Sequence, residues 1–197
     1  MRLIGLFVVI AAMQLNCTSK YVLTCRKDLL TVSRKICIEQ VGTLEQGENR
    51  GIKIERYLAA VNLPAGYPYC AAGQYWCFAA ACRRLNICEK NIPVPRTGLA
   101  NVMFNYAKKT GIAVKYSPVI DDLLVWRRGK SSFGHIERII STAKAGWVYT
   151  VGFNTVKVTG NKKHEGVFLH KRNIYHFLGR MHIRGIIGFV HGGSDDT

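Results

Sequence analysis

The sequence predicts an α+β fold, with helices in the first half of the chain and a β-sheet in the second. Apolar residues recur at helical spacing up to about residue 109. The stretch at 70–85 is rich in Ala and large apolar residues, which predicts a helix buried in the middle of the domain. After Gly111, short runs of β-branched and aromatic residues alternate with turn formers. Helices followed by strands are typical of domains in which the helices cover one face of a sheet.

The composition predicts a single globular domain over residues 18–197. The chain has 197 residues, 48% of them hydrophobic and 20% charged, which is enough apolar material for a core and excludes a disordered protein. The net charge of +16 indicates an anionic partner. Nucleic acid, anionic lipid and the acidic polymers of a bacterial wall all fit that charge.

The first 17 residues predict export. Met1-Arg2 gives a short positive start, residues 3–13 are apolar, and the run is too short to be a stable transmembrane helix. Cys17 directly after it resembles a bacterial lipoprotein cleavage site, although Asn16 departs from the small residue that is usual there. We therefore expect residues 1–17 to be a signal peptide and Cys17 to carry the lipid. The protein would then be periplasmic or anchored in a bacterial membrane.

Four helices are predicted in the first half of the chain. Their apolar residues favour helices at 25–41, 52–61, 70–85 and 99–109. A loop with three glycines separates the first two, and Asn62 and Pro64 end the second.

The second half of the chain predicts an antiparallel sheet with one face packed on the central helix. Seven runs have strand character, at 112–116, 123–126, 135–141, 147–151, 155–159, 167–169 and 184–190.

Cys70 is the candidate nucleophile. Pro68 excludes helix before residue 69, so Cys70 lies in the first helical turn. There the free N–H groups and the helix dipole stabilise a thiolate. The alternative is that Cys70 is one more small apolar residue in a Cys-rich core.

His135 and Asn154 are the candidate partners of Cys70. Of the six histidines, His135 follows a glycine at the start of a strand pattern, and Asn154 ends the next strand pattern. Antiparallel neighbours would bring the two together, as in the Cys-His-Asn arrangement of papain-like hydrolases. Glu137 lies on the same strand face as His135 and is an alternative orienting residue. Its more ordinary interpretation is a solvated charge beside Arg138.

Several motifs together resemble the CHAP-type cysteine amidases and their NlpC relatives, over about residues 26–190. Gly66-Tyr67-Pro68-Tyr69-Cys70-Ala71-Ala72 is similar to the nucleophile motif of that family, and Gly134-His135-Ile136 is similar to its histidine motif. Further similar segments are 45–51, 56–58, 122–129, 152–155, 165–167 and 171–172. One departure is Gly152, which stands where the family commonly has the Glu that orients the histidine.

The resemblance implies a papain-like fold and hydrolysis of an amide bond in peptidoglycan, either in a stem peptide or between sugar and peptide. Cys70 would attack the carbonyl, and His135 would hold the thiolate as an ion pair and protonate the leaving amine. The Cys70 N–H would bind the oxyanion. We expect a monomer without metal or cofactor, with peptidoglycan as its partner, a membrane contact through the lipid and no nucleic acid.

Two other functions fit parts of the sequence. Gly152 would suit a catalytically weakened wall-binding protein of the same fold. The charge would suit a basic nucleic-acid-binding protein, but the predicted signal peptide and the dispersed Lys and Arg residues argue against it. Among the cysteines, Cys82 with Cys88 and Cys25 with Cys37 are candidate disulfides, while Cys77 is interpreted as a buried helix residue.

Overall fold

The computed structural model describes residues 19–191, which form an α+β fold with one mixed sheet. The helices are α1 (Lys27–Glu39), α2 (Ile52–Ala59), α3 (Cys70–Leu85), the short 3-10 helix η1 (Glu89–Asn91) and α4 (Ala100–Thr110). The strands are β1 (Ser19–Cys25), β2 (Ile112–Val114), β3 (Leu123–Arg127), β4 (Gly134–Thr142), β5 (Trp147–Thr159), β6 (Lys162–Asn173) and β7 (His182–His191).

The sheet has the strand order β2-β1-β7-β3-β4-β5-β6. All neighbouring pairs are antiparallel except β1 and β7, which are parallel. The prediction of a purely antiparallel sheet was therefore wrong at this pair. The parallel pair arises from β1, a strand that was not predicted although its sequence Tyr21-Val22-Leu23-Thr24 has strand composition.

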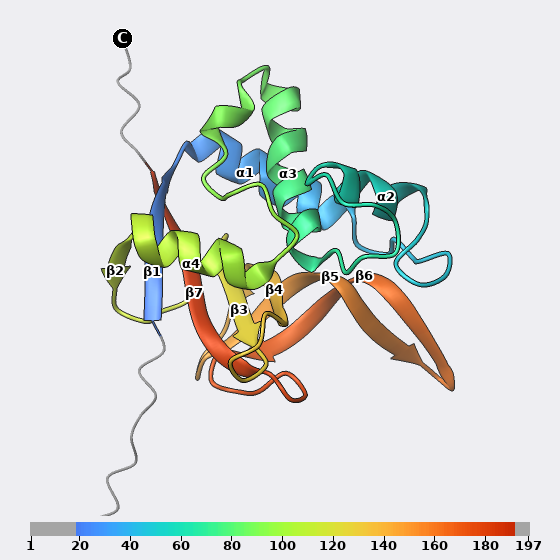
Figure 1. Ribbon diagram of the computed structural model, residues 1–197. Helices are drawn as coiled ribbons and strands as arrows, with labels where there is room; N and C mark the ends of the chain where they lie inside the picture. The colour runs from blue at the N-terminus through green and yellow to red at the C-terminus, as the bar shows by residue number, and fades with distance from the viewer. Residues whose placement is uncertain (1–18, 192–197) are drawn as a thin grey trace, which may run out of the picture.

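The helices lie on one face of the sheet, with α3 in the middle (Figure 1). α3 contacts β4 and β5, α4 contacts β1, β3, β4 and β7, and α1 and α2 pack against α3. α3 is thus held between the sheet and two other helices.

α3 is buried on almost all sides, as its composition predicts. It begins directly after Tyr69 and ends at Asn86, whose left-handed backbone (φ 52°) closes the last turn. Gly73 lets the helix approach β5 closely, because a Cβ atom at Gly73 would lie 2.2 Å from the ring of Phe153. No larger residue fits there without moving the helix away from the sheet.

The helix predictions are confirmed to within two residues at each end. The strand predictions are confirmed only in part, because the two runs predicted as separate strands at 147–151 and 155–159 form one continuous strand, β5. The pairing of β5 with β6 shifts register between Gly152 and Thr155, and Asn154 within this bulge has a φ of 56°. The bulge separates the two hydrophobic runs in the sequence without ending the strand.

The opposite face of the sheet carries a second, smaller apolar cluster around Leu124, Trp126 and Ile186. Ile174 packs in this cluster too, and Leu178 packs against it from the segment between β6 and β7. Both faces of β3 and β4 are therefore shielded from water, which explains how polar side chains on β4 come to be buried.

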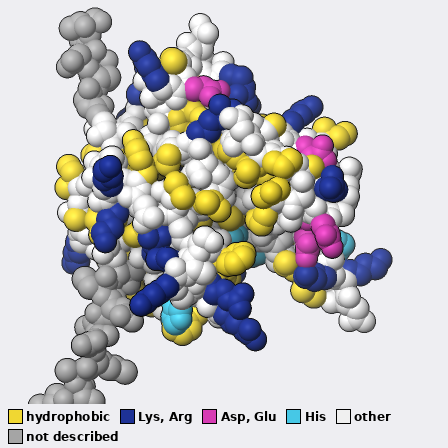
Figure 2. All heavy atoms as spheres, viewed as in Figure 1, with side chains coloured by type: hydrophobic (Ala, Val, Ile, Leu, Met, Phe, Trp, Pro, Cys, Tyr) yellow, Lys and Arg dark blue, Asp and Glu magenta, His cyan; other side chains and the backbone are white. Residues whose placement is uncertain are grey.

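Lys and Arg side chains are spread over the visible face and outnumber the acidic ones (Figure 2). None of the helices within residues 19–191 is long and apolar enough to cross a membrane.

Candidate active site

Cys70 is the first residue of α3 and is 5% exposed. No side chain caps this helix end. The N–H groups of the first turn of a helix have no helical acceptor, so they and the helix dipole favour negative charge at this position. The Cys70 thiol donates weakly to the carbonyl oxygen of Gly134, with 4.0 Å between Sγ and O. The structure therefore places the predicted nucleophile at a helix N-terminus, directly against the start of β4.

His135, the second residue of β4, lies against Cys70 and is 7% exposed. Its Nε2 lies 3.0 Å from Oε1 of Glu137. The Cys70 sulfur lies near enough to the ring to raise the pKa of His135, and Nδ1 is the ring nitrogen that the Glu137 contact leaves free for it. The Trp126 ring packs beside the imidazole, with 5.9 Å between the ring centroids. One ring nitrogen thus faces the thiol and the other a carboxylate.

Glu137 is completely buried, and besides His135 two residues hold its carboxylate through three hydrogen bonds. Thr150 donates to Oε2 over 2.5 Å, and Arg172 donates from Nε to Oε2 over 3.0 Å and from Nη2 to Oε1 over 2.7 Å. Both carboxylate oxygens are satisfied, and the Arg172 contact is bidentate, which is the geometry of the strongest such pairs. The carboxylate is therefore fixed in place beside the imidazole.

These contacts set the charge of the pair. Burial by itself would lower the pKa of His135, but the hydrogen bonds to Cys70 and Glu137 outweigh it and raise that pKa to about 9. Burial likewise opposes ionisation of Glu137, yet hydrogen bonds from His135 and Arg172 hold the pKa of Glu137 well below its usual range. At neutral pH the site contains an imidazolium and a carboxylate.

Asn154 does not contact His135. Its side-chain amide donates to Oδ1 of Asn49 over 2.7 Å and to Oε1 of Glu45 over 3.4 Å. Pairing of β4 with β5 runs from Thr142 only to Glu137 opposite Gly152, and the left-handed backbone of Asn154 turns its side chain toward the loop before α2. The predicted contact of Asn154 with the histidine was therefore wrong, and the alternative, Glu137, occupies that position.

The interpretation of Glu137 as a solvated strand charge was also wrong, because neither Glu137 nor Arg138 is exposed to solvent. Successive strand residues point to opposite faces. Arg138 accordingly lies on the helix side of the sheet, where its guanidinium is 4.6 Å from the centre of the Phe78 ring and donates to Ser33. The two charges do not pair with each other.

Tyr69, directly before the nucleophile, is tied to the loop at 44–51. Its hydroxyl donates to Oε1 of Glu45 over 2.9 Å, and the same carboxylate accepts from the N–H of Asn49. Tyr69 is itself completely buried in the core. The contact of Tyr69 with Glu45 fixes the segment that leads into α3.

A hollow of about 360 Å³ lies between this loop and β6, lined by Leu44, Glu45, Gly47, Glu48 and residues 163–165. It reaches Glu45 but none of Cys70, His135 and Glu137. The hollow therefore adjoins the loop that supports the site and is not the place where Cys70 would react.

Gly152 explains how Glu137 reaches this position. The two residues are directly opposite each other on β5 and β4. A Cβ atom at Gly152 would lie 2.8 Å from Oε1 of Glu137 and 2.7 Å from Cγ2 of Thr155. The absent side chain at Gly152 leaves the space that the Glu137 carboxylate fills.

We expect Gly152→Glu to damage the site instead of restoring it. The new side chain would overpack the space and place a second carboxylate against Glu137. The free energy of unfolding should fall by about 1–3 kcal/mol. Thermal unfolding is compared with that of Val156→Glu, which adds the same charge at an exposed position of β5. A Gly152→Glu protein with unchanged stability would contradict the close packing of these two positions.

Thr150 and Arg172 were not predicted as partners of Glu137. The strand pattern places these residues near Glu137, because residues 148, 150 and 152 share a face of β5 and Arg172 on β6 pairs opposite Val148. That placement can be predicted only when the register of β4, β5 and β6 is known.

Two other expectations concern ligands and the anchor. Among residues 19–191, no group of three His, Cys, Asp or Glu side chains is placed to hold a metal ion. Cys17, the predicted lipid attachment site, and the predicted signal peptide lie outside the described residues.

Comparison of the chain with known protein families, with curated proteins and with solved structures found no match. The function is therefore argued from the site and from the motifs in the sequence.

Proposed function

We propose that this protein is a papain-like cysteine hydrolase of the CHAP type that cleaves an amide bond of bacterial peptidoglycan. The observation that carries the proposal is the alignment of Cys70, His135 and Glu137. A thiol at a helix N-terminus, an imidazolium beside it and a buried carboxylate behind the imidazolium are the three parts of a cysteine hydrolase. The choice of peptidoglycan depends on the resemblance of the motifs around Cys70 and His135 to that family.

In the proposed reaction, the Cys70 sulfur attacks the amide carbon and forms a tetrahedral intermediate. The N–H of Cys70 lies in the first turn of α3 and is available to the oxyanion. His135 then protonates the leaving amine, and an acyl-enzyme remains. Water, deprotonated by the neutral His135, releases the acid and restores the thiolate–imidazolium pair. Glu137 keeps the ring in its orientation and stabilises its positive charge in each half of the reaction.

Glu137 also weakens the case for a catalytically weakened wall-binding protein. That alternative was motivated by Gly152, which stands where the family commonly has an orienting Glu. Because Glu137 supplies a carboxylate that is bonded to the imidazole at 3.0 Å, the substitution does not leave the histidine without a partner.

The positive charge of the chain supports an anionic wall polymer as the partner. The basic side chains are scattered over the visible face (Figure 2), whereas a nucleic-acid-binding protein would concentrate them along one element. We propose that the enzyme is an exported monomer and that Cys17 anchors it to the membrane, which would place it beside its substrate.

The test is mass spectrometry of purified peptidoglycan after incubation with the full-length protein. We expect soluble fragments with a new amino group and a new carboxyl group, each cut adding one water. The mass of the fragments identifies the bond as one within a stem peptide or one between sugar and peptide. The matched control is Cys70→Ala, which removes only the sulfur from the site.

Fragments with new reducing sugar ends would show cleavage of glycan strands and would overturn the proposal. Binding to the wall without new ends, in wild type and Cys70→Ala alike, would favour the wall-binding protein. Fragments formed equally by both proteins would exclude Cys70 as the nucleophile.

A further inference from the structure

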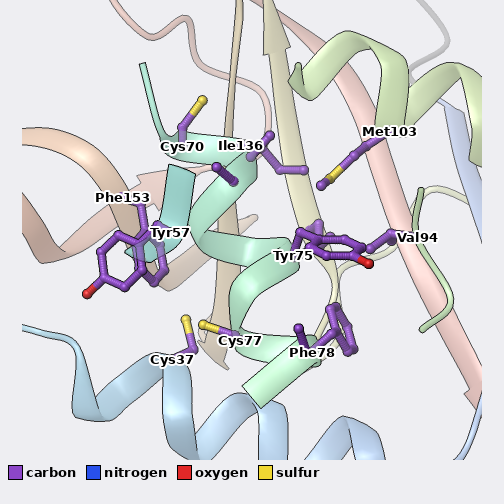
Figure 3. Packing of buried hydrophobic residues seen from close by; sticks show 14 of the residues in the cluster. Cys37, Tyr57, Cys70, Tyr75, Cys77, Phe78, Val94, Met103, Ile136 and Phe153 are labelled. Atoms are coloured by element: carbon purple, nitrogen blue, oxygen red, sulfur yellow. The ribbon is translucent and has the colours of Figure 1, made fainter. Parts of the chain in front are cut away.

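Cys37 and Cys77 meet in the centre of the protein. Cys37 lies on α1 and Cys77 on α3, and both are completely buried. Figure 3 shows their sulfur atoms pointing toward one another between the two helices. Nothing in the proposed reaction uses this pair.

The other described cysteines are arranged differently. Cys25 ends β1, and its thiol donates to the carbonyl of Arg26. Cys88 is exposed, whereas Cys82 is buried on α3. Cys70 lies seven positions before Cys77 on the same helix, which is about 10 Å along the helix axis. The neighbour of Cys37 is thus Cys77, and the pairing of Cys25 with Cys37 considered from the sequence is not the one that the fold favours.

We propose that Cys37 and Cys77 form a disulfide that fastens α1 to the nucleophile helix when the chain folds under oxidising conditions. The two thiols give up two protons and two electrons to a disulfide oxidant such as oxidised glutathione, which becomes two thiols. The two sulfur atoms already face each other between α1 and α3 (Figure 3), which is the orientation that a disulfide requires. This inference is independent of the proposed reaction and would hold for a protein of this fold without activity.

The timing of this bond follows from burial. Burial and the neighbouring Cys37 raise the pKa of the Cys77 thiol well above its ordinary value, so this thiol is protonated and unreactive in the folded, reduced protein. Both side chains are also completely buried, out of reach of a dissolved oxidant. Oxidation therefore takes place during folding, before α1 covers α3. A bond formed then would leave Cys70, two helical turns away, without Cys77 as a competing partner.

The stabilisation should be large because the bond closes a long loop. The segment from Cys37 to Cys77 includes α2 and the whole entry into α3. A disulfide across a loop of about 40 residues is expected to raise Tm by roughly 5–15 °C in a domain of this size.

The experiment is oxidative refolding of the full-length chain in a mixture of reduced and oxidised glutathione. Free thiols are then blocked with iodoacetamide, and the protein is digested without reduction and analysed by mass spectrometry. We expect a peptide pair linked through Cys37 and Cys77, and a blocked, unlinked Cys70. Blocked Cys37 and Cys77 in the folded product, or a link from Cys37 to Cys25, would overturn the proposal.

Stability provides the second measurement. The Tm of the oxidised wild type should fall on reduction, whereas the Tm of a Cys37→Ala/Cys77→Ala variant should not respond to reductant. Cys88→Ser removes an exposed thiol and should keep the full response of the wild type. If the double variant does not fold, the peptide map of the wild type still shows whether Cys37 and Cys77 are linked. An equal response to reductant in the double variant would assign the stabilisation to another pair.

Discussion

Cys70→Ala is expected to abolish hydrolysis, with a fall in kcat of roughly 10⁵-fold or more, because it removes the atom that attacks the substrate. The fold should remain, since Ala71 and Ala72 show that this turn of α3 accepts alanine. The thiol makes one weak hydrogen bond, to the carbonyl of Gly134, which alanine gives up at little cost. Activity on purified peptidoglycan and thermal unfolding are measured on the same preparation.

Chemical labelling distinguishes whether Cys70 is a reactive nucleophile or an unreactive core thiol. Iodoacetamide at neutral pH should label Cys70 of the reduced protein faster than Cys77. Cys70 lies beside His135 at a helix N-terminus, whereas burial and Cys37 raise the pKa of the Cys77 thiol well above its ordinary value. His135→Ala should slow the labelling of Cys70 without changing that of the exposed Cys88. Labelling of Cys88 with Cys70 untouched, together with an active Cys70→Ala protein, would assign Cys70 to the core.

The helical half of the fold could be predicted from the sequence because each helix carries its own signals. Pro68 fixes the start of α3, the apolar residues of α1, α2 and α4 recur at helical spacing, and the buried character of α3 follows from its composition. These are local properties. The position of Cys70 depends only on them, which is why the sequence locates it correctly.

The orienting residue depends on strand register, which is not a local property. Opposite pairing of residues 137 and 152, continued in register, would bring Asn154 opposite His135. The bulge at 152–155 and the left-handed backbone of Asn154 interrupt that register. No residue type in the sequence indicates the bulge, because Asn is common in many turns. The burial of Glu137 was missed for the same reason, since it requires β5, β6 and the segment around Ile174 to be in place.

Glu137→Gln is expected to lower kcat by roughly 10²- to 10⁴-fold while the protein stays folded. An amide at this position still accepts from Arg172 or Thr150, but it no longer carries the charge that stabilises the imidazolium. The loss should be smaller than for Cys70→Ala, because Glu137 touches neither substrate nor the transferred proton. Thermal unfolding is measured in parallel, because Arg172 loses its charged partner.

The pH profile gives a readout that a purely structural role would not change. The pKa of His135 is raised to about 9, so the imidazolium that protonates the leaving amine persists at neutral pH and is lost as the pH rises through about 9. The stabilisation that the ion pair gives to the fold is complete below the ordinary histidine pKa and disappears over the same alkaline range. In Glu137→Gln, the alkaline fall of kcat should move to lower pH, because one of the two contacts that raise this pKa has lost its charge.

The matched control is Asn154→Ala, which tests the residue that the sequence favoured. Asn154 bonds to Glu45 and Asn49 and not to His135. Asn154→Ala should lower kcat only a few-fold, because it loosens the loop whose Glu45 holds Tyr69. The fall of kcat at alkaline pH should stay near pH 9. Glu137→Asp keeps the charge on a shorter side chain. Relative to Glu137→Gln, it should restore part of kcat and move the alkaline fall of kcat back toward pH 9. A protein that loses turnover with Asn154→Ala and retains it with Glu137→Gln would show that His135 is oriented through β5 during catalysis, against the geometry described above.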